Sequence, residues 1–365
     1  MTLDHDEKLA RLRLWRTPRV GPATFANLMQ RFGSAQEALE RLPGHVRALG
    51  RTPPHIPSRE AAIREIETLH KMGGRFIFAG TPEASRLLDH TPDAPPLLAT
   101  LGRVELLQRP TLAIVGSRNA SLSGKTLTRS FAEAIGQAGY AIISGLAKGI
   151  DTAAHQAALP TGTIAVVAGG IDVIYPRENA ALHQQIAEQG LIVSEQPLGM
   201  PTSARLFPLR NRLVSGLTLG TLVVEAGVRS GSLITARLAA EQGREVFAIP
   251  GSPLEGRAEG SNLLIKQGAT LVSNAQEILT ALQGLHDPGF EDRRRQDQLR
   301  VEPVAQDLSA LRKRILDVLS IQGVGIDALT QECQGTPAQM QTALADLEVA
   351  GFIIRTPGAL IALHP

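Results

Sequence analysis

The sequence predicts an α/β protein built on a doubly wound parallel sheet, with a helical domain before the sheet and a winged-helix domain after it. Two apolar runs, Thr111–Gly116 and Tyr140–Ser144, each stop at a Gly/Ser turn, and a helical pattern lies between them. A strand–helix–strand unit of this kind pairs its strands in parallel. Further alternation of the same kind up to residue 283 indicates one extended Rossmann-like sheet.

The other elements of this sheet follow from the same two periodicities. Further strands are expected at 163–168, 191–194, 221–225 and 245–249, with a short one at 269–272. The helices are expected at 122–137, 150–158, 179–189, 208–216, 231–242, 261–267 and 274–283. Strands as continuously apolar as 163–168 fit a sheet that is covered on both faces. Before this region, residues 73–108 are expected to hold one strand, at 75–79, and a Pro-rich lead-in.

We expect four segments: a helical domain at 1–72, the Rossmann-like domain at 73–284, a polar, charged linker at 285–306 and a last domain at 307–365. In the first, Val20-Gly21-Pro22, an apolar helix and Phe32-Gly33-Ser34 resemble a helix-hairpin-helix (SAM-like) module. The amides of its turn can face a phosphate, and a packing module without a ligand is an equal alternative.

The last domain is predicted to be a winged helix, with helices at 308–320, 325–333 and 337–350 and a hairpin of 352–355 with 360–363. The third helix enters the major groove in DNA-binding examples. Here it has no Lys or Arg and carries Asp346 and Glu348. This favours a protein-contact or regulatory role over duplex binding, since phosphates repel carboxylates.

Bulk composition excludes several classes of protein. The net charge is only +2, so a nucleic-acid site requires a local cluster of Arg and Lys. One cysteine, Cys333, excludes an intramolecular disulfide and multi-cysteine zinc sites and indicates a reducing compartment. The N-terminal residues lack the apolar core of a signal peptide, and no apolar run approaches the ~20 residues of a membrane span. We therefore expect a cytoplasmic protein without a membrane partner.

Catalytic motifs are weak. The dinucleotide fingerprint is absent after Gly116, and the near-match to an ATPase P-loop at 119–126 has Asn119 where the first glycine belongs. Glu225, at the end of a predicted strand, is the best single candidate for acid–base chemistry.

Cations gather where the predicted strands end. Because ligands of such sheets lie at the carboxyl ends of the strands, these side chains should share one edge. They are too many for one small phosphate and suit a phosphodiester backbone, with Phe207 as a plate on which a base stacks. Structural ion pairs with Asp151, Asp172 or Glu195 are the competing explanation for one or two of them. The cations are Arg118, Lys148, Arg177, Arg205, Arg210 and Arg212.

These residues, taken together, resemble the DNA processing protein A family (DprA, also called Smf). The motifs that carry the resemblance occur in order as GSR (116–118), SGLAKGID (144–151), AGGID (168–172), YPREN (175–179), FPLRNR (207–212), VVEAGVRSGSLITA (223–236) and IPGSP (249–253), with EGSNLLIKQGA at 259–269.

The resemblance implies a non-enzymatic protein without a cofactor that protects single-stranded DNA during natural transformation and loads RecA recombinase onto it. It implies a homodimer formed through the Rossmann-like domain, and single-strand-binding protein is a further candidate partner. Arg118 would be the central phosphate contact and Phe207 would contact a base. The full expected site is Gly116, Ser117, Arg118, Ser144, Gly145, Lys148, Gly149, Arg177, Arg205, Phe207, Arg210, Asn211 and Arg212, where Arg205 is added from charge and position alone.

Two enzymatic alternatives stay open. One is a nucleotide hydrolase resembling the lysine decarboxylase-like group, with Glu225 and the GVRSGS turn at its site, although the Pro-Gly-Gly of that group's signature is missing. The other is an ATPase that uses the near-match P-loop.

Overall fold

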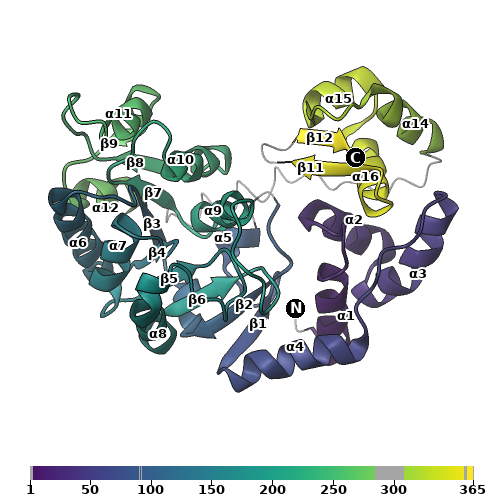
Figure 1. Ribbon diagram of the computed structural model, residues 1–365, viewed down its shortest axis with the longest axis horizontal. Coiled ribbons are helices and arrows are strands. Elements are labelled where there is room, and N and C mark those ends of the chain that lie inside the picture. Colours follow the sequence, from purple (N-terminus) through teal and green to yellow (C-terminus); the bar gives the residue numbers. More distant parts are fainter. Residues whose placement is uncertain (1–2, 90, 92, 284–307, 357–359, 365) are drawn as a thin grey trace. The chain divides into compact units, whose positions relative to one another are not determined.

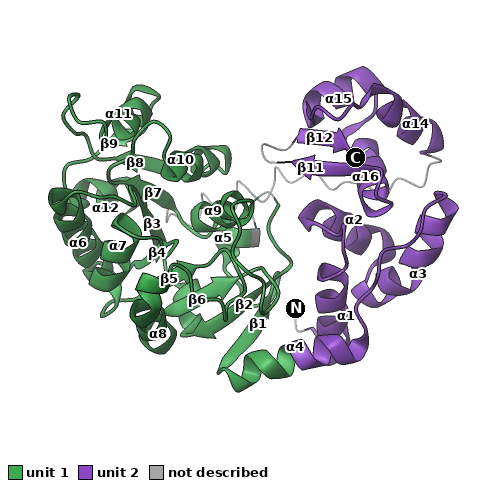
Figure 2. Cartoon of the chain, in the orientation of Figure 1, with its two compact units in different colours: residues 1, 66–297 green, residues 2–65, 298–365 purple. Residues whose placement is uncertain are grey.

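The computed structural model describes residues 3–89, 91, 93–283, 308–356 and 360–364. The chain divides into two compact units (Figure 2). Residues 66–297 form unit 1, and residues 2–65 with 298–365 form unit 2. The linker predicted at 285–306 and the tip of the predicted hairpin at 357–359 lie outside the described residues.

Unit 1 is built on a nine-stranded sheet in the order β1-β2-β6-β5-β4-β3-β7-β8-β9, and the strands from β6 to β9 are parallel. This confirms the predicted doubly wound sheet (Figure 1). The strands are β1 (Gly74–Phe78), β2 (Leu97–Gly102), β3 (Thr111–Val115), β4 (Ala141–Ser144), β5 (Thr163–Val166), β6 (Leu191–Ser194), β7 (Gly220–Val223), β8 (Glu245–Ala248) and β9 (Thr270–Leu271).

The expectation of a single strand before residue 108 is wrong. A second strand, β2, pairs antiparallel with β1 on one side and with β6 on the other. Its six residues, Leu97–Gly102, follow the prolines of the lead-in directly, and Leu97 to Ala99 are buried. The strand joins the β1 hairpin to the edge of the parallel sheet.

Helices cover both faces of the sheet because side chains of a strand alternate between faces. The helices of this unit are α5 (Arg86–Asp89), η1 (Val104–Gln108), α6 (Leu122–Gln137), α7 (Ile150–Ala158), η2 (Arg177–Asn179), α8 (Ala180–Gln189), α9 (Leu206–Gly216), α10 (Gly231–Glu241), α11 (Glu259–Lys266) and α12 (Ala275–Gln283). In β3, Leu112 and Ile114 pack in one core with α6, α7 and α12, whereas Ala113 and Val115 pack in the other core with α9 and α10.

Unit 2 combines the two ends of the chain. The N-terminal helices are α1 (His5–Trp15), α2 (Pro22–Phe32), α3 (Ala35–Ala48) and α4 (Arg59–Lys71), the last of which continues into unit 1. The C-terminal elements are α14 (Ser309–Val318), β10 (Val324–Gly325), α15 (Ile326–Cys333), α16 (Pro337–Val349), β11 (Ile353–Thr356) and β12 (Leu360–Leu363). Three helices with a β10-β12-β11 sheet make the predicted winged helix. Within the described residues, no helix has the length and apolar character that a bilayer crossing requires.

Candidate nucleic-acid interface

The candidate site lies at the carboxyl ends of the central strands of unit 1. The chain runs outward from β3 to β6 on one side and then returns to β7 on the other, so the strand order reverses between β3 and β7. Ligands of open α/β sheets bind at such a switch point. Two cavities open here, of about 300 Å³ over β4 and β5 and about 590 Å³ over β3 and β7. We call them the first and the second cavity. They adjoin, since both are lined by Arg118, Asn119, Gly145, Ala147, Phe207 and Arg210.

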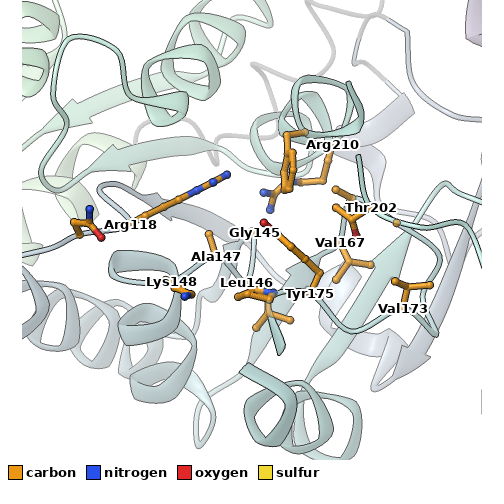
Figure 3. A pocket seen from close by; sticks show the side chains of 15 residues that line it. Arg118, Gly145, Leu146, Ala147, Lys148, Val167, Val173, Tyr175, Thr202 and Arg210 are labelled. Carbon is orange, nitrogen blue, oxygen red and sulfur yellow. The ribbon is translucent and has the colours of Figure 1, made fainter. Parts of the chain in front are cut away.

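Arg118 stands on the turn after β3 and extends into the first cavity (Figure 3). Among the described residues it has no ion-pair partner, and its guanidinium lies 5.2 Å from the centre of the Phe207 ring. The turn packs tightly on α7, because the Ile150 amide donates to the Ser117 carbonyl (3.2 Å) and a Cβ on Gly116 would lie 2.7 Å from Ile150 Cγ1. The fold therefore holds an uncompensated positive charge at the cavity.

Arg210 reaches the cavity from α9, opposite Arg118 (Figure 3), but it is only 6% exposed. Its Nη1 donates to the Val166 carbonyl (3.0 Å), and its Nε has no partner within the described part of the chain. Burial lowers the pKa of this guanidinium, and the positive charge of Arg118 adds to that effect, whereas the nearby carboxylate of Asp151 raises it. A buried cation with an unused donor favours an anionic ligand.

Asp151, at the start of α7, organises the floor beneath Arg210. Its Oδ2 accepts hydrogen bonds from the amides of Gly145 (3.1 Å) and Ala147 (3.2 Å). Burial raises the pKa of this carboxyl, and the positive charge of Arg210 opposes the effect. Gly145 leaves room for the guanidinium, because a Cβ at this position would lie 1.5 Å from Arg210 Nη1 and would displace it.

An aromatic pair lies beside the two arginines. The rings of Phe207 and Tyr175 are 5.7 Å apart at 55°, and the Arg210 guanidinium lies 5.9 Å from the Phe207 centroid. Tyr175 is 48% exposed and lines the first cavity. It was not among the predicted site residues, although it is one of only two tyrosines in the chain and lies in the YPREN motif. A large ring on an exposed strand-end loop was the available signal.

The other predicted residues occupy different positions around the cavities. Lys148 lines the first cavity, where its ammonium pairs with Glu178 (2.5 Å), and Asn211 lines the second cavity. Gly149 has φ +81° and supports the turn from below, since a Cβ there would lie 2.3 Å from the Ser117 carbonyl oxygen.

Besides Gly149, four predicted residues line neither cavity. Ser144 is fully buried and its hydroxyl donates to the Ile114 carbonyl (2.6 Å). Arg177, at the start of η2, and Arg205, directly before α9, are both exposed, and neither has an ion pair among the described residues. Arg212 pairs with the buried carboxylate of Glu195, so here the competing explanation, a structural ion pair, applies.

The second cavity adds one cation that the prediction did not include. Arg229 lies on the exposed loop between β7 and α10 and has no ion pair within the described residues. The residues after it, Ser230 to Ser232, also line this cavity, and Ser230 caps α10. The RSGS turn at the end of a strand was the available signal.

Glu225 is hydrogen-bonded to Ser121 and lines neither cavity. Glu225 has φ +68° and accepts hydrogen bonds from the Ser121 amide (2.9 Å) and hydroxyl at the start of α6. Its carboxylate fills the space next to Gly124, where a Cβ would lie 2.6 Å from it. The helix start of the near-match P-loop is therefore occupied by this side chain.

Neither buried histidine near the site faces a cavity. Burial, aided by Arg210, lowers the pKa of His155 to about 3, and burial also lowers the pKa of His183. Across the described residues, no group of three or more His, Cys, Asp and Glu could hold a metal ion.

Comparison with known proteins gives consistent matches over the three domains. Residues 75–283 match the model of DNA recombination-mediator protein A, residues 5–68 that of a DprA-like N-terminal HHH domain, and residues 301–359 that of a DprA winged-helix domain. Protein Smf of Escherichia coli is 42% identical over 278 residues, which is 75% of this chain and 73% of that protein.

Two solved structures are also similar. DNA processing protein A from Streptococcus pneumoniae superposes with a TM-score of 0.62 at 33% identity, covering 77% of this chain and 98% of that one. The protein from Helicobacter pylori, whose structure was described for its single-stranded DNA binding mode, superposes at 0.53 with 32% identity, covering 57% of this chain and 96% of that one.

Proposed function

The chain belongs to the DNA recombination-mediator protein A family, and on that basis we propose that it binds single-stranded DNA across the first and second cavities and acts as a recombination mediator. The relative from Helicobacter pylori is described as binding single-stranded DNA, which supports the same ligand class here.

One arrangement carries the proposal: Arg118, without an ion pair in the described chain, and the buried Arg210 converge beside the Phe207–Tyr175 pair. Cations attract the phosphates of a nucleic-acid backbone, and aromatic faces stack on bases of any sequence. The two guanidinium groups and the two rings all line the first cavity. A nucleotide chain meets both, with a base against the rings and its phosphates at the guanidinium groups.

The shape of the site favours a single strand over a duplex. The rings lie in cavities at the carboxyl ends of the strands, and a base of a duplex must leave the stack of base pairs to reach them. The cationic surface also extends over both cavities, because Arg229 lines the second cavity and Lys148 the first, with Arg118 in both. A small nucleotide substrate would leave part of this cationic path unused.

The biological part of the proposal rests on family membership. We propose that the protein protects incoming single strands during natural transformation and loads RecA onto them without catalysis. Single-strand-binding protein, a homodimer formed through the Rossmann-like domain and a cytoplasmic location belong to the same proposal. The position of Glu225 against Ser121 supports a non-enzymatic function, since its carboxylate is engaged at the start of α6.

The direct test is fluorescence anisotropy of a labelled oligo-dT over a salt series, with an unlabelled duplex of equal length as competitor. Removing one phosphate contact in Arg118→Ala should weaken binding and reduce the slope of log K against log salt by about 0.7. Arg237→Ala is the matched control, because Arg237 is exposed, pairs with Glu241 on its own helix and lines neither cavity.

An unchanged slope in Arg118→Ala, or equal competition by the duplex, would reject the proposed DNA path. RecA loading is tested separately, as RecA filament formation on a single strand coated with single-strand-binding protein, with and without this protein. Binding without loading would retain the DNA site and reject the mediator role.

A further inference from the structure

The third helix of the winged helix, α16, is buried on every side in its C-terminal half. The eight residues from Ala343 to Ala350 are all buried, although a helix on the surface of a domain exposes one face. Ala343, Leu344 and Leu347 pack in the core of the winged helix, whereas Val349 and Ala350 pack in the core of the N-terminal helices. The helix therefore belongs to both ends of the chain.

Asp346, 2% exposed, is the charged centre of this contact. Its Oδ1 accepts from Arg31 Nη1 (3.0 Å) on α2 and lies 2.6 Å from His45 Nε2 on α3. Its Oδ2 accepts from Arg312 Nη1 (2.8 Å) on α14, in its own domain. A carboxylate this buried is tolerated only when it is paired, and two of its three partners come from the N-terminal domain.

Glu348, two residues after Asp346 in α16, makes a second polar contact with the N-terminal helices. Its Oε2 accepts from the Thr24 hydroxyl on α2 and from Arg355 Nε (3.1 Å) on β11. Nearby, Asn27 Nδ2 donates to Thr342 Oγ1 (3.3 Å). The acidic residues that argue against duplex binding thus have a structural role, which is to bind α2 and α3.

The contact continues beyond the end of α16. Phe352 packs against both cores, and the guanidinium of Arg51 lies 4.1 Å from the centre of its ring. Across the contact, the N-terminal side supplies Arg31, His45 and Arg51, and the C-terminal side supplies the two carboxylates and an aromatic face. The two surfaces are complementary in charge.

We propose that α16 is the docking helix of this chain's own N-terminal domain, so that the helix a winged-helix domain ordinarily offers to a duplex is engaged within the chain. Helix–turn–helix domains place this helix in the major groove. In α16 only the uncharged Pro337 and Gln341 are exposed, so the helix has no basic or continuous free face for that contact. The inference goes beyond single-strand binding and is independent of it. The two terminal domains act as one module.

The test is crosslinking of the full-length protein with a short bismaleimide. The pair Asn27→Cys with Thr342→Cys joins positions whose side chains are in hydrogen-bond contact, so the variant should crosslink efficiently within one chain. The matched control combines Asn27→Cys with Gln331→Cys on α15, a helix that packs on α14 and β10, and should not crosslink. The native Cys333 is buried and stays in place.

The crosslinked protein is then compared with the uncrosslinked protein for affinity to a labelled duplex. We expect the Kd values of the crosslinked and uncrosslinked proteins for the duplex to agree within about twofold, a difference of only ~0.4 kcal/mol. A helix that is already docked on the N-terminal domain loses no duplex-binding face when it is crosslinked there. A tenfold or greater loss of duplex binding on locking would show that α16 opens and binds duplex, which overturns the proposal. Crosslinking of the control pair alone, or of neither pair, also overturns it.

A double-mutant cycle gives an independent measurement. Arg31→Ala and Asp346→Asn should each lower the thermal midpoint by about 2–4 °C, and the double variant should be less destabilised than the sum. Glu37→Ala is the control for Arg31, since Glu37 is exposed and its one ion pair within the described residues is with Arg41 on its own helix. Additive effects of the two substitutions would contradict the docking.

Discussion

Arg118 and Arg210 line the same cavity, yet their substitution should have different consequences for folding. Arg210→Met removes the charged hydrogen bond to the Val166 carbonyl, a bond that contributes about 1.5–3 kcal/mol. It also leaves the buried Asp151 without the positive charge of Arg210, which lowers the pKa of that carboxyl. Together these losses should lower the free energy of unfolding by about 3 kcal/mol. Arg118→Met removes an exposed cation without an ion pair in the described chain and should cost less than about 0.5 kcal/mol.

Urea unfolding of the two variants and the wild type, followed by circular dichroism, measures this difference. Both variants should lose affinity for oligo-dT, so binding alone does not separate the two roles. Measuring both stability and binding separates the two roles. Arg118 is expected to contribute to DNA binding only, and Arg210 to both DNA binding and the stability of the α7–α9 region.

Equal stability of the two variants, within about 0.5 kcal/mol, would refute the reasoning, because a buried, hydrogen-bonded cation cannot then be worth more than an exposed one. Arg210→Lys is a useful third variant. It keeps the charge but not the planar group that donates to Val166, and we expect an intermediate loss of stability.

Four further predictions follow from the same geometry. His155, whose pKa burial lowers to about 3, is neutral in the fold but is protonated in the unfolded chain below pH 6.5, so stability falls as pH drops from 6.5 towards 3. Urea unfolding should show a loss of about 2 kcal/mol between pH 7 and pH 5 that His155→Asn lacks, and an equal loss in that variant contradicts the assignment. Gly145→Ala places a Cβ against Arg210 and should lower the free energy of unfolding by about 1–3 kcal/mol, measured in urea; wild-type stability would show that the contact is not tight. Glu225→Ala removes the acceptor at the start of α6 and should cost about 1 kcal/mol in the same assay while anisotropy shows wild-type affinity for oligo-dT; lost affinity would place this carboxylate in the site. Tyr175→Ala should weaken oligo-dT binding about five- to tenfold in the anisotropy assay, whereas Tyr175→Phe should not, and equal loss in both would exclude stacking.

The sequence by itself determined the core of the fold. Apolar runs such as Thr111–Val115 and Leu191–Ser194, with helical patterns between them, predicted the parallel sheet, because strand and helix periods are local properties of the chain. The turn after β3 was located from its Gly-Ser-Arg triplet, and Phe207 was selected as the aromatic residue of the motif that opens α9. The predicted winged helix was recognised in the same way.

Only the tertiary structure decided which charges are available. Six cations were predicted at one edge, but Arg212 pairs with Glu195, seventeen positions away, and Arg210 is buried next to Asp151 while Arg118 is exposed. The acidic residues of α16 likewise acquire partners more than 300 positions away. Local sequence patterns report the period and polarity of a segment, whereas the burial and pairing of a charge depend on which distant segments the fold brings against it.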